Sequence, residues 1–208
     1  MTETPQTTNA QTSEQTAPAR PRFTTRSLLL CVVLGAFTAA ILHLARIVGM
    51  MLLATAPWLG SPSALIPWFV MILVAALLVP RAGAALLTSV IGTLAGVGTM
   101  SLMAGIVIEL VFISARAIQR RRGGIAEVGD RSGLWVSIVA AVLVGAMSFG
   151  MLFAIKEFQA LTPALMSLGI VVRIVAGLAY GALAYGIVRG LLGAGFDPIG
   201  PGRRKAGR

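Results

Sequence analysis

A few charged and aromatic side chains inside long apolar runs are the residues of this chain best suited to bind a ligand. Glu109 lies near the centre of one such run, residues 101–122, which ends in a cluster of arginines. A single carboxylate midway through a membrane helix is costly unless it meets a partner, a proton or a ligand. We therefore take Glu109 as a candidate binding residue.

The composition determines the class of protein in which this carboxylate lies. The chain has 208 residues, of which 57% are hydrophobic and 12% charged, and its mean hydropathy is +0.89. A soluble domain of this size could not keep so much apolar surface away from water. The sequence predicts an all-α, polytopic membrane protein.

Charge and cysteine content exclude other classes. The net charge is +10, but the basic residues stand at the ends of apolar runs and not on an amphipathic face with interleaved aromatic residues, so nucleic-acid binding is not expected. The single cysteine, Cys31, lies inside an apolar run and forms neither a disulfide framework nor a metal-ligand cluster.

Hydropathy divides the chain into a disordered, cytoplasmic tail (1–25), a membrane domain (26–193) and a basic cytoplasmic tail (194–208). The first apolar run resembles a signal peptide, but His43 and Arg46 interrupt it, which favours an uncleaved span. A continuous helix over 84–118 would overrun the roughly 30 Å hydrocarbon core, so two spans are expected there. The six predicted spans are 27–56, 64–79, 84–97, 100–117, 134–155 and 163–192.

The distribution of basic residues predicts the orientation. With the N-terminus in the cytoplasm, every arginine and lysine outside the spans falls on the inner side except Lys156. This asymmetry follows the positive-inside rule, so we expect both termini in the cytoplasm and a multi-pass protein of the plasma membrane.

This topology assigns a depth to each polar residue. Counted from the outer end of their spans, Glu109 lies roughly 12–14 Å deep and Arg173 and Arg46 roughly 15 Å. His43 is one turn deeper than Arg46, and Trp68 is in the outer part of the second span. We therefore predict that these side chains share one level in the outer half of the membrane and line a binding site.

Structural roles for the same residues remain open. Glu109 and Arg173 could form a buried ion pair that locks the bundle, since charges inside membranes commonly pair. His43 and Arg46 could cap backbone carbonyls, while Trp68 and Trp58 could belong to the interfacial aromatic belt. An ion pair that lines a cavity could still receive a ligand.

Small residues at helical spacing predict close helix packing. Arg173, Gly177 and Gly181 form one stripe, which we expect to face the bundle. In the first span Ala36 and Ala40 offer a flat face to another helix.

Three segments resemble the YkoE-type substrate-binding (S) subunits of energy-coupling factor (ECF) vitamin transporters. The resemblance covers about residues 26–192, and its most specific pieces are PRAGAAL, ELVF with Glu109, and RIVAG with Arg173. The segments are LLVPRAGAALLTSVIGTLAGVG, GIVIELVFISARAIQRRR and VVRIVAGLAYGALAYGIVRGLL.

The resemblance implies a six-helix subunit that captures thiamine or its hydroxymethylpyrimidine precursor from outside and topples in the membrane during uptake. Its partners would be a transmembrane coupling subunit, which the alanine motif of Ala36 and Ala40 would contact, and two ATPases. Glu109 would accept a hydrogen bond from an aminopyrimidine or stabilise a thiazolium, and Trp68 or Trp58 would stack on the ring.

Missing motifs agree with this expectation. The chain has no GxxxxGK[ST] phosphate loop, so ATP hydrolysis would belong to a partner. It also lacks a paired acid, a Ser/His set or an HExxH motif, so we expect neither an enzyme nor a resident metal or cofactor. The alternatives are an S subunit for another small vitamin and a membrane scaffold locked by Glu109 and Arg173.

Overall fold

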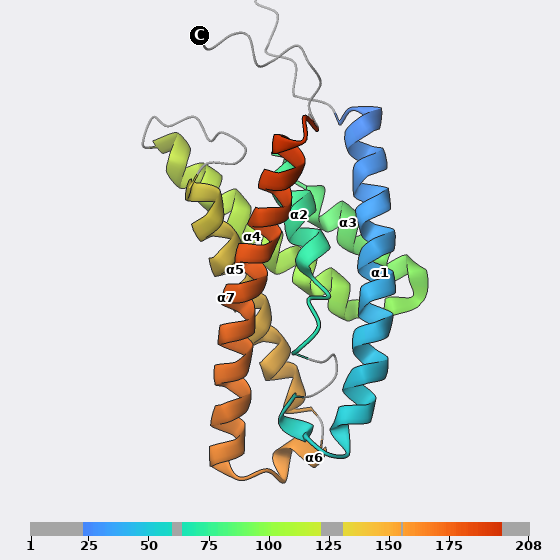
Figure 1. Cartoon of the computed structure of the whole chain (residues 1–208), viewed down its shortest axis with the longest axis vertical. Coiled ribbons are helices and arrows are strands. Elements are labelled where there is room, and N and C mark those ends of the chain that lie inside the picture. Colours follow the sequence, from blue (N-terminus) through green and yellow to red (C-terminus); the bar gives the residue numbers. More distant parts are fainter. Residues whose placement is uncertain (1–22, 60–63, 122–130, 155, 197–208) are drawn as a thin grey trace, which may run out of the picture.

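The computed structural model describes residues 23–59, 64–121, 131–154 and 156–196, and within these ranges every regular element is helical (Figure 1). This confirms the predicted all-α class. The elements are α1 (Thr25–Leu53), η1 (Pro57–Leu59), α2 (Val70–Leu78), α3 (Ala84–Gly92), η2 (Thr93–Val97), α4 (Thr99–Arg121), α5 (Arg131–Leu152), α6 (Lys156–Gln159) and α7 (Pro163–Gly193).

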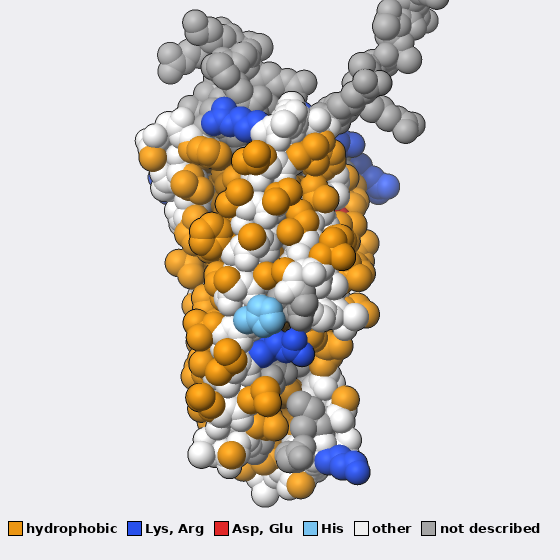
Figure 2. Space-filling model, turned by 90° about the vertical axis from the view of Figure 1, so that its right-hand side faces the viewer, with side chains coloured by type: hydrophobic (Ala, Val, Ile, Leu, Met, Phe, Trp, Pro, Cys, Tyr) orange, Lys and Arg blue, Asp and Glu red, His pale blue; other side chains and the backbone are white. Residues whose placement is uncertain are grey.

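Four of these helices, α1, α4, α5 and α7, are long and apolar enough to cross a membrane. Large hydrophobic side chains on them face outward, among them Leu29, Met50 and Trp135, which are 63%, 70% and 67% exposed. Figure 2 shows such side chains covering most of one face of the molecule. This surface is stable only in lipid, so the protein is a multi-pass membrane protein.

Helix α2 is much shorter than the predicted second span. It has nine residues and a length of about 14 Å, and it begins at Val70, whereas the predicted span begins at residue 64. Residues 64–69 form turns instead, because Pro67 lacks the N–H that a helix interior needs. Eight of the nine residues of α2 are buried, as expected for a helix that is apolar on every side and packs in the centre of the bundle.

Helices α3 and α4 form a hairpin that turns back about halfway along the bundle (Figure 1). The turn follows η2, a π-helical segment, and contains Gly98 at φ 81°, a conformation that favours glycine. The predicted break between the third and fourth spans is therefore confirmed. Ser101 on α4 donates to the carbonyl of Ser89 on α3 at 3.2 Å, which joins the two arms.

Helices α5 and α7 pack closely through small residues. A Cβ atom at Gly181 would lie 2.6 Å from Cα of Ile138, and one at Gly177 would lie 3.0 Å from Cα of Val142. Ser137 also donates to the carbonyl of Gly181 at 3.0 Å. The stripe on α7 thus faces the bundle, as predicted.

The first and last described residues lie at the same end of the bundle. The guanidinium of Arg26 is 5.3 Å from the ring centroid of Phe196, and α6 lies at the opposite end (Figure 1). The two predicted tails fall almost entirely outside the described residues.

Candidate functional site

Arg173 is the buried centre of the candidate site. It projects from the middle of α7, is 3% exposed, and holds the connection between α1 and α2. Its Nη1 donates to the carbonyl of Trp58 at 3.0 Å and its Nη2 to that of Leu59 at 2.8 Å. Its guanidinium carbon also lies 5.9 Å from the ring centroid of Phe149.

One donor of this guanidinium is unused. Among the described residues, Nε of Arg173 is the one buried side-chain nitrogen or oxygen without a hydrogen-bond partner. A buried donor left unpaired costs about 1–3 kcal/mol. An acceptor on a bound ligand would remove that cost.

Aromatic side chains lie around this donor. Trp68 is 2% exposed and meets Phe69 edge to face at 5.2 Å between ring centroids, and Phe69 meets Tyr180 of α7 at 5.8 Å. The hydroxyl of Tyr180 donates to the carbonyl of Ala64 at 2.9 Å. Helix α7 therefore ties the α1–α2 connection near both of its ends, through Arg173 and Tyr180.

The space between these groups is almost closed. The cavity has a volume of about 10 Å³, which is room for a single water molecule. A vitamin-sized ligand therefore requires the α1–α2 connection to move away from α7. The residues around the cavity include Ile66, Trp68, Gly145, Ser148, Arg173 and Tyr180.

Glu109 lies elsewhere and does not pair with Arg173. It is 3% exposed, and its two carboxylate oxygens accept from the backbone N–H groups of Gly83 at 2.8 Å and Ala85 at 3.0 Å. Unpaired N–H groups at the start of a helix favour a negative charge, so the carboxylate caps α3. The ion pair that the sequence left open is not formed, because each side chain bonds backbone groups instead.

The predicted common depth is also wrong. Glu109 binds the start of α3 close to Arg81, whose guanidinium donates to Ser27 in the first turn of α1 at 3.3 Å. Arg173 instead binds Trp58, beyond the last turn of α1. Counting residues from the outer end of a full span misplaced Glu109, because α4 begins halfway along the bundle (Figure 1).

His43 and Arg46 form a third group on the outside of α1. Both are exposed and lie beside the turn of the α3–α4 hairpin, where Nε2 of His43 is 3.4 Å from the carbonyl of Ala95. Figure 2 shows a histidine and a basic side chain beside it near the middle of this face, with hydrophobic side chains above and below them. His43 thus interacts with a backbone carbonyl, as one of the two sequence interpretations proposed.

The structure therefore brings together Arg173, Trp68 and Trp58 out of the six predicted site residues. Tyr180 and Ser148 also line the cavity but were not predicted. Tyr180 follows Arg173 by seven residues, two turns along the same face of α7, and this spacing could have identified it. No comparable signal singles out Ser148 among the small residues of α5.

Ala36 and Ala40 are exposed on α1. The opposite side of the helix packs against α3, where a Cβ atom at Gly35 would lie 2.8 Å from Cβ of Ile91. The face that carries the two alanines is thus turned away from α3.

Comparison with known proteins identifies the fold. No protein-family model matches the chain, and no curated protein sequence matches it significantly. Among solved structures, the chain is similar to a crystal structure of an S component of an ECF transporter, with a TM-score of 0.62 and 22% sequence identity. The similarity covers 84% of this chain and 88% of the other. The protein therefore has the fold of an ECF S component.

Proposed function

We propose that this protein is the substrate-binding S subunit of an ECF-type importer in the plasma membrane, and that it binds thiamine or its hydroxymethylpyrimidine precursor. The observation that carries the proposal is the S-component fold over 84% of the chain. The buried aromatic and guanidinium groups of the candidate site support a small, flat, polar ligand. Such a subunit transports and is not an enzyme.

The chemistry of the site favours the pyrimidine over thiamine. Nε of Arg173 can donate to a ring nitrogen, and the flat faces of Trp68 and Tyr180 can pack against a heteroaromatic ring. The thiazolium of thiamine carries a positive charge, which a buried guanidinium repels. Cation–π contact with Trp68 would only partly offset this repulsion.

A vitamin that carries a carboxylate is the second candidate. A guanidinium binds a carboxylate through two parallel hydrogen bonds, and this arrangement is stronger than a bond to a neutral acceptor. The described residues around the cavity include no acidic side chain that would oppose such a ligand.

Transport would require partners that supply energy. The chain contains no phosphate loop, so two ATPases and a transmembrane coupling subunit would drive uptake. The exposed face of α1 with Ala36 and Ala40 is our proposed contact for the coupling subunit, because small residues let membrane helices approach closely.

The test is to identify the bound ligand. The protein is purified in detergent and denatured, and the released small molecules are measured by mass spectrometry for the wild type, Arg173→Gln and Arg189→Gln. Arg189 is an exposed arginine near the other end of α7, which makes it a matched control. We expect the wild type and the control to release a stoichiometric pyrimidine, and Arg173→Gln to release at least tenfold less.

A second variant separates ligand binding from closure of the site. Tyr180→Phe removes a tie to the α1–α2 connection but leaves the guanidinium in place, so it should retain most of the ligand. Release of a carboxylate vitamin would replace the pyrimidine assignment by the second candidate. If the wild type releases no small molecule, and neither thiamine nor the pyrimidine raises its melting temperature, the substrate-binding proposal is wrong.

A further inference from the structure

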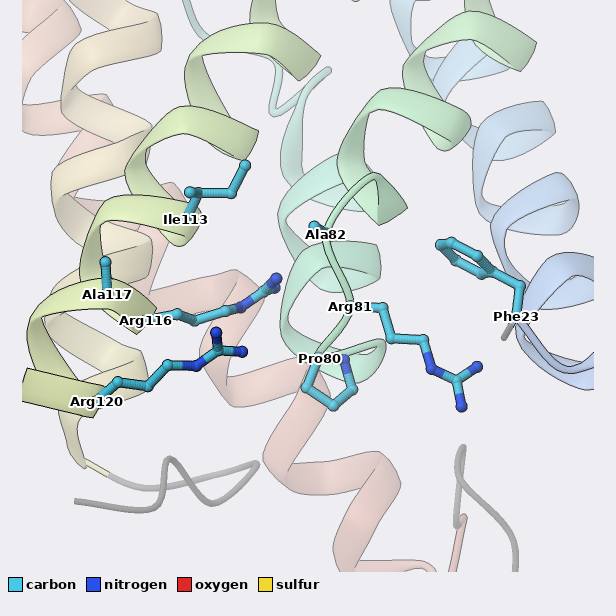
Figure 3. Close-up of a pocket in the computed structure, with 8 residues that line it drawn as sticks. All are labelled: Phe23, Pro80, Arg81, Ala82, Ile113, Arg116, Ala117 and Arg120. Carbon is cyan, nitrogen blue, oxygen red and sulfur yellow. The ribbon is translucent and has the colours of Figure 1, made fainter. Parts of the chain in front are cut away.

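A second cavity lies at the end of the bundle that carries both described chain ends. Its volume is about 360 Å³, and Figure 3 shows the residues around it. Phe23 lies two residues before α1, and the Pro80–Ala82 segment lies between α2 and α3. Arg116 and Arg120 belong to the last turns of α4. The cavity is thus separate from the site around Arg173, which lies beyond the other end of α1.

Positive charge is concentrated in this cavity. Arg81, Arg116 and Arg120 line it together, and Figure 3 shows the side chains of Arg116 and Arg120 extending from α4 into the same space. Arg81 extends toward Phe23, with its guanidinium carbon 5.8 Å from the ring centroid, and donates to Ser27. Arg116 and Arg120 are one turn apart, and like charges at this spacing repel each other.

No carboxylate of the described residues forms an ion pair with these arginines. Glu109, two turns before Arg116, attracts it electrostatically, but both of its oxygens accept backbone N–H groups at the start of α3. The contact recorded for Arg116 is with an aromatic ring, that of Phe112 at 5.8 Å. Arg116 and Arg120 therefore offer guanidinium donors that have no hydrogen-bond acceptor among those residues.

The position of the cavity matches the level of lipid headgroups. Apolar residues of α4 such as Ile113 line its deeper part, and the arginines stand at the end of the apolar stretch. Basic pockets between membrane helices at this level bind phosphate headgroups, and guanidinium forks match phosphate oxygens with two parallel bonds.

We propose that this cavity binds an anionic phosphate group, held by Arg116 and Arg120 with Arg81 at its side. Two sources share this chemistry, the headgroup of an anionic phospholipid and free phosphate. Bound phosphate relieves the repulsion between the two arginines and joins α4 to the α2–α3 connection.

The test measures binding to the full chain purified in detergent. Phosphatidylglycerol, phosphatidylcholine with the same acyl chains, and inorganic phosphate are each titrated and followed by native mass spectrometry and melting temperature. The variant Arg116→Gln/Arg120→Gln is compared with Arg121→Gln/Arg189→Gln, which removes two exposed charges that do not line the cavity.

We expect the wild type and the control to retain one phosphatidylglycerol, and the cavity variant to bind it at least tenfold more weakly. Phosphatidylcholine should not be retained. Arg116→Lys/Arg120→Lys keeps the charge but not the planar fork, so it should bind with intermediate affinity. If the glutamine variant does not fold, the affinity of this lysine variant is compared with that of the wild type instead.

The titrations distinguish the two sources. Phosphatidylglycerol that millimolar phosphate does not displace identifies a lipid site, whereas saturable binding of phosphate with no preference for the lipid identifies a site for the free ion. Equal binding by the wild type and the cavity variant, or an equal loss in the control, overturns the proposal. The proposal is also overturned if the wild type binds neither ligand but the variant Glu127→Gln/Asp130→Asn does. These two acidic residues follow α4 in the sequence.

Discussion

Glu109 and Arg173 illustrate how single residues keep a charge inside this bundle. The carboxylate accepts two N–H groups at the beginning of α3, and the guanidinium donates to two carbonyls beyond the end of α1. Both sets of backbone groups lie where a helix begins or a connection runs, so helical hydrogen bonds do not use them. Each charge therefore stabilises a chain segment through its backbone groups, and the carbonyl of Leu59 also accepts from the N–H of Ala64 at 3.4 Å.

Replacing Glu109 by glutamine tests its role as a helix cap. The amide oxygen can still accept one N–H group, but the amide nitrogen then faces the other. We expect Glu109→Gln to lower the free energy of unfolding by about 1–3 kcal/mol, measured by denaturation in detergent. Ligand affinity should stay within about twofold, because Glu109 is remote from the cavity around Arg173. A variant that loses the ligand but melts like the wild type would contradict this role.

At the residue scale, the sequence predicts some site members and not others. Arg173, Trp68 and Trp58 could be found because charged and aromatic residues are conspicuous in apolar spans. Their partners could not, because Arg173 binds the carbonyls of Trp58 and Leu59, and any residue type supplies a carbonyl. Opposite charge suggested Arg173 as the partner of Glu109, but Glu109 also binds backbone groups, the N–H groups of Gly83 and Ala85.

At the scale of elements, the closely packed helices α5 and α7 depend on glycine at chosen positions. Gly181 faces Ile138 and has no room for a Cβ atom, whereas Gly186, on the same helix, has no other atom within 4 Å of that position. The two glycines therefore form a matched pair.

We expect Gly181→Ala to separate the two helices and to destabilise the protein by about 1–3 kcal/mol. Gly186→Ala should be neutral or stabilise it by up to about 1 kcal/mol, since alanine favours the helix. Melting temperatures in detergent measure both effects. Equal destabilisation by the two variants would show that backbone flexibility, and not packing, is needed at these positions.

The lengths of the elements could be predicted only in part. The long helices α1, α5 and α7 begin and end within about three residues of the expected spans, because each is one long, predominantly apolar run. Residues 64–69 are apolar as well, yet they form turns that lead into α2. Hydropathy identifies segments that are buried away from water. A buried turn around Pro67 has the same hydropathy as a buried helix, so the two could not be distinguished.

At the scale of the whole molecule, both described chain ends lie at the same end of the bundle, so the predicted orientation places them on the same side of the membrane. The predicted arrangement places these ends in the cytoplasm and α6 outside. Cys31, the single cysteine, is fully buried, so the wild type should not react with a maleimide reagent and provides a clean background.

Two single-cysteine additions test this orientation in intact cells. A membrane-impermeant maleimide should label Gln159→Cys, on the exposed surface of α6, and should leave Ser13→Cys unlabelled until the cells are opened. The reverse pattern would place the termini outside. The cavity around Arg173 would then face the cytoplasm and could not capture a substrate from the medium.

The contact between Arg173 and the α1–α2 connection has a consequence for evolution. Arg173 supplies both donors from one planar guanidinium, whereas Trp58 and Leu59 form these hydrogen bonds through their carbonyls. Substitutions at Trp58 and Leu59 therefore leave both acceptor groups of this contact in place. A descendant could thus acquire a different ligand through changes in the α1–α2 connection, while Arg173 on α7 keeps its hydrogen bonds to the backbone of that connection.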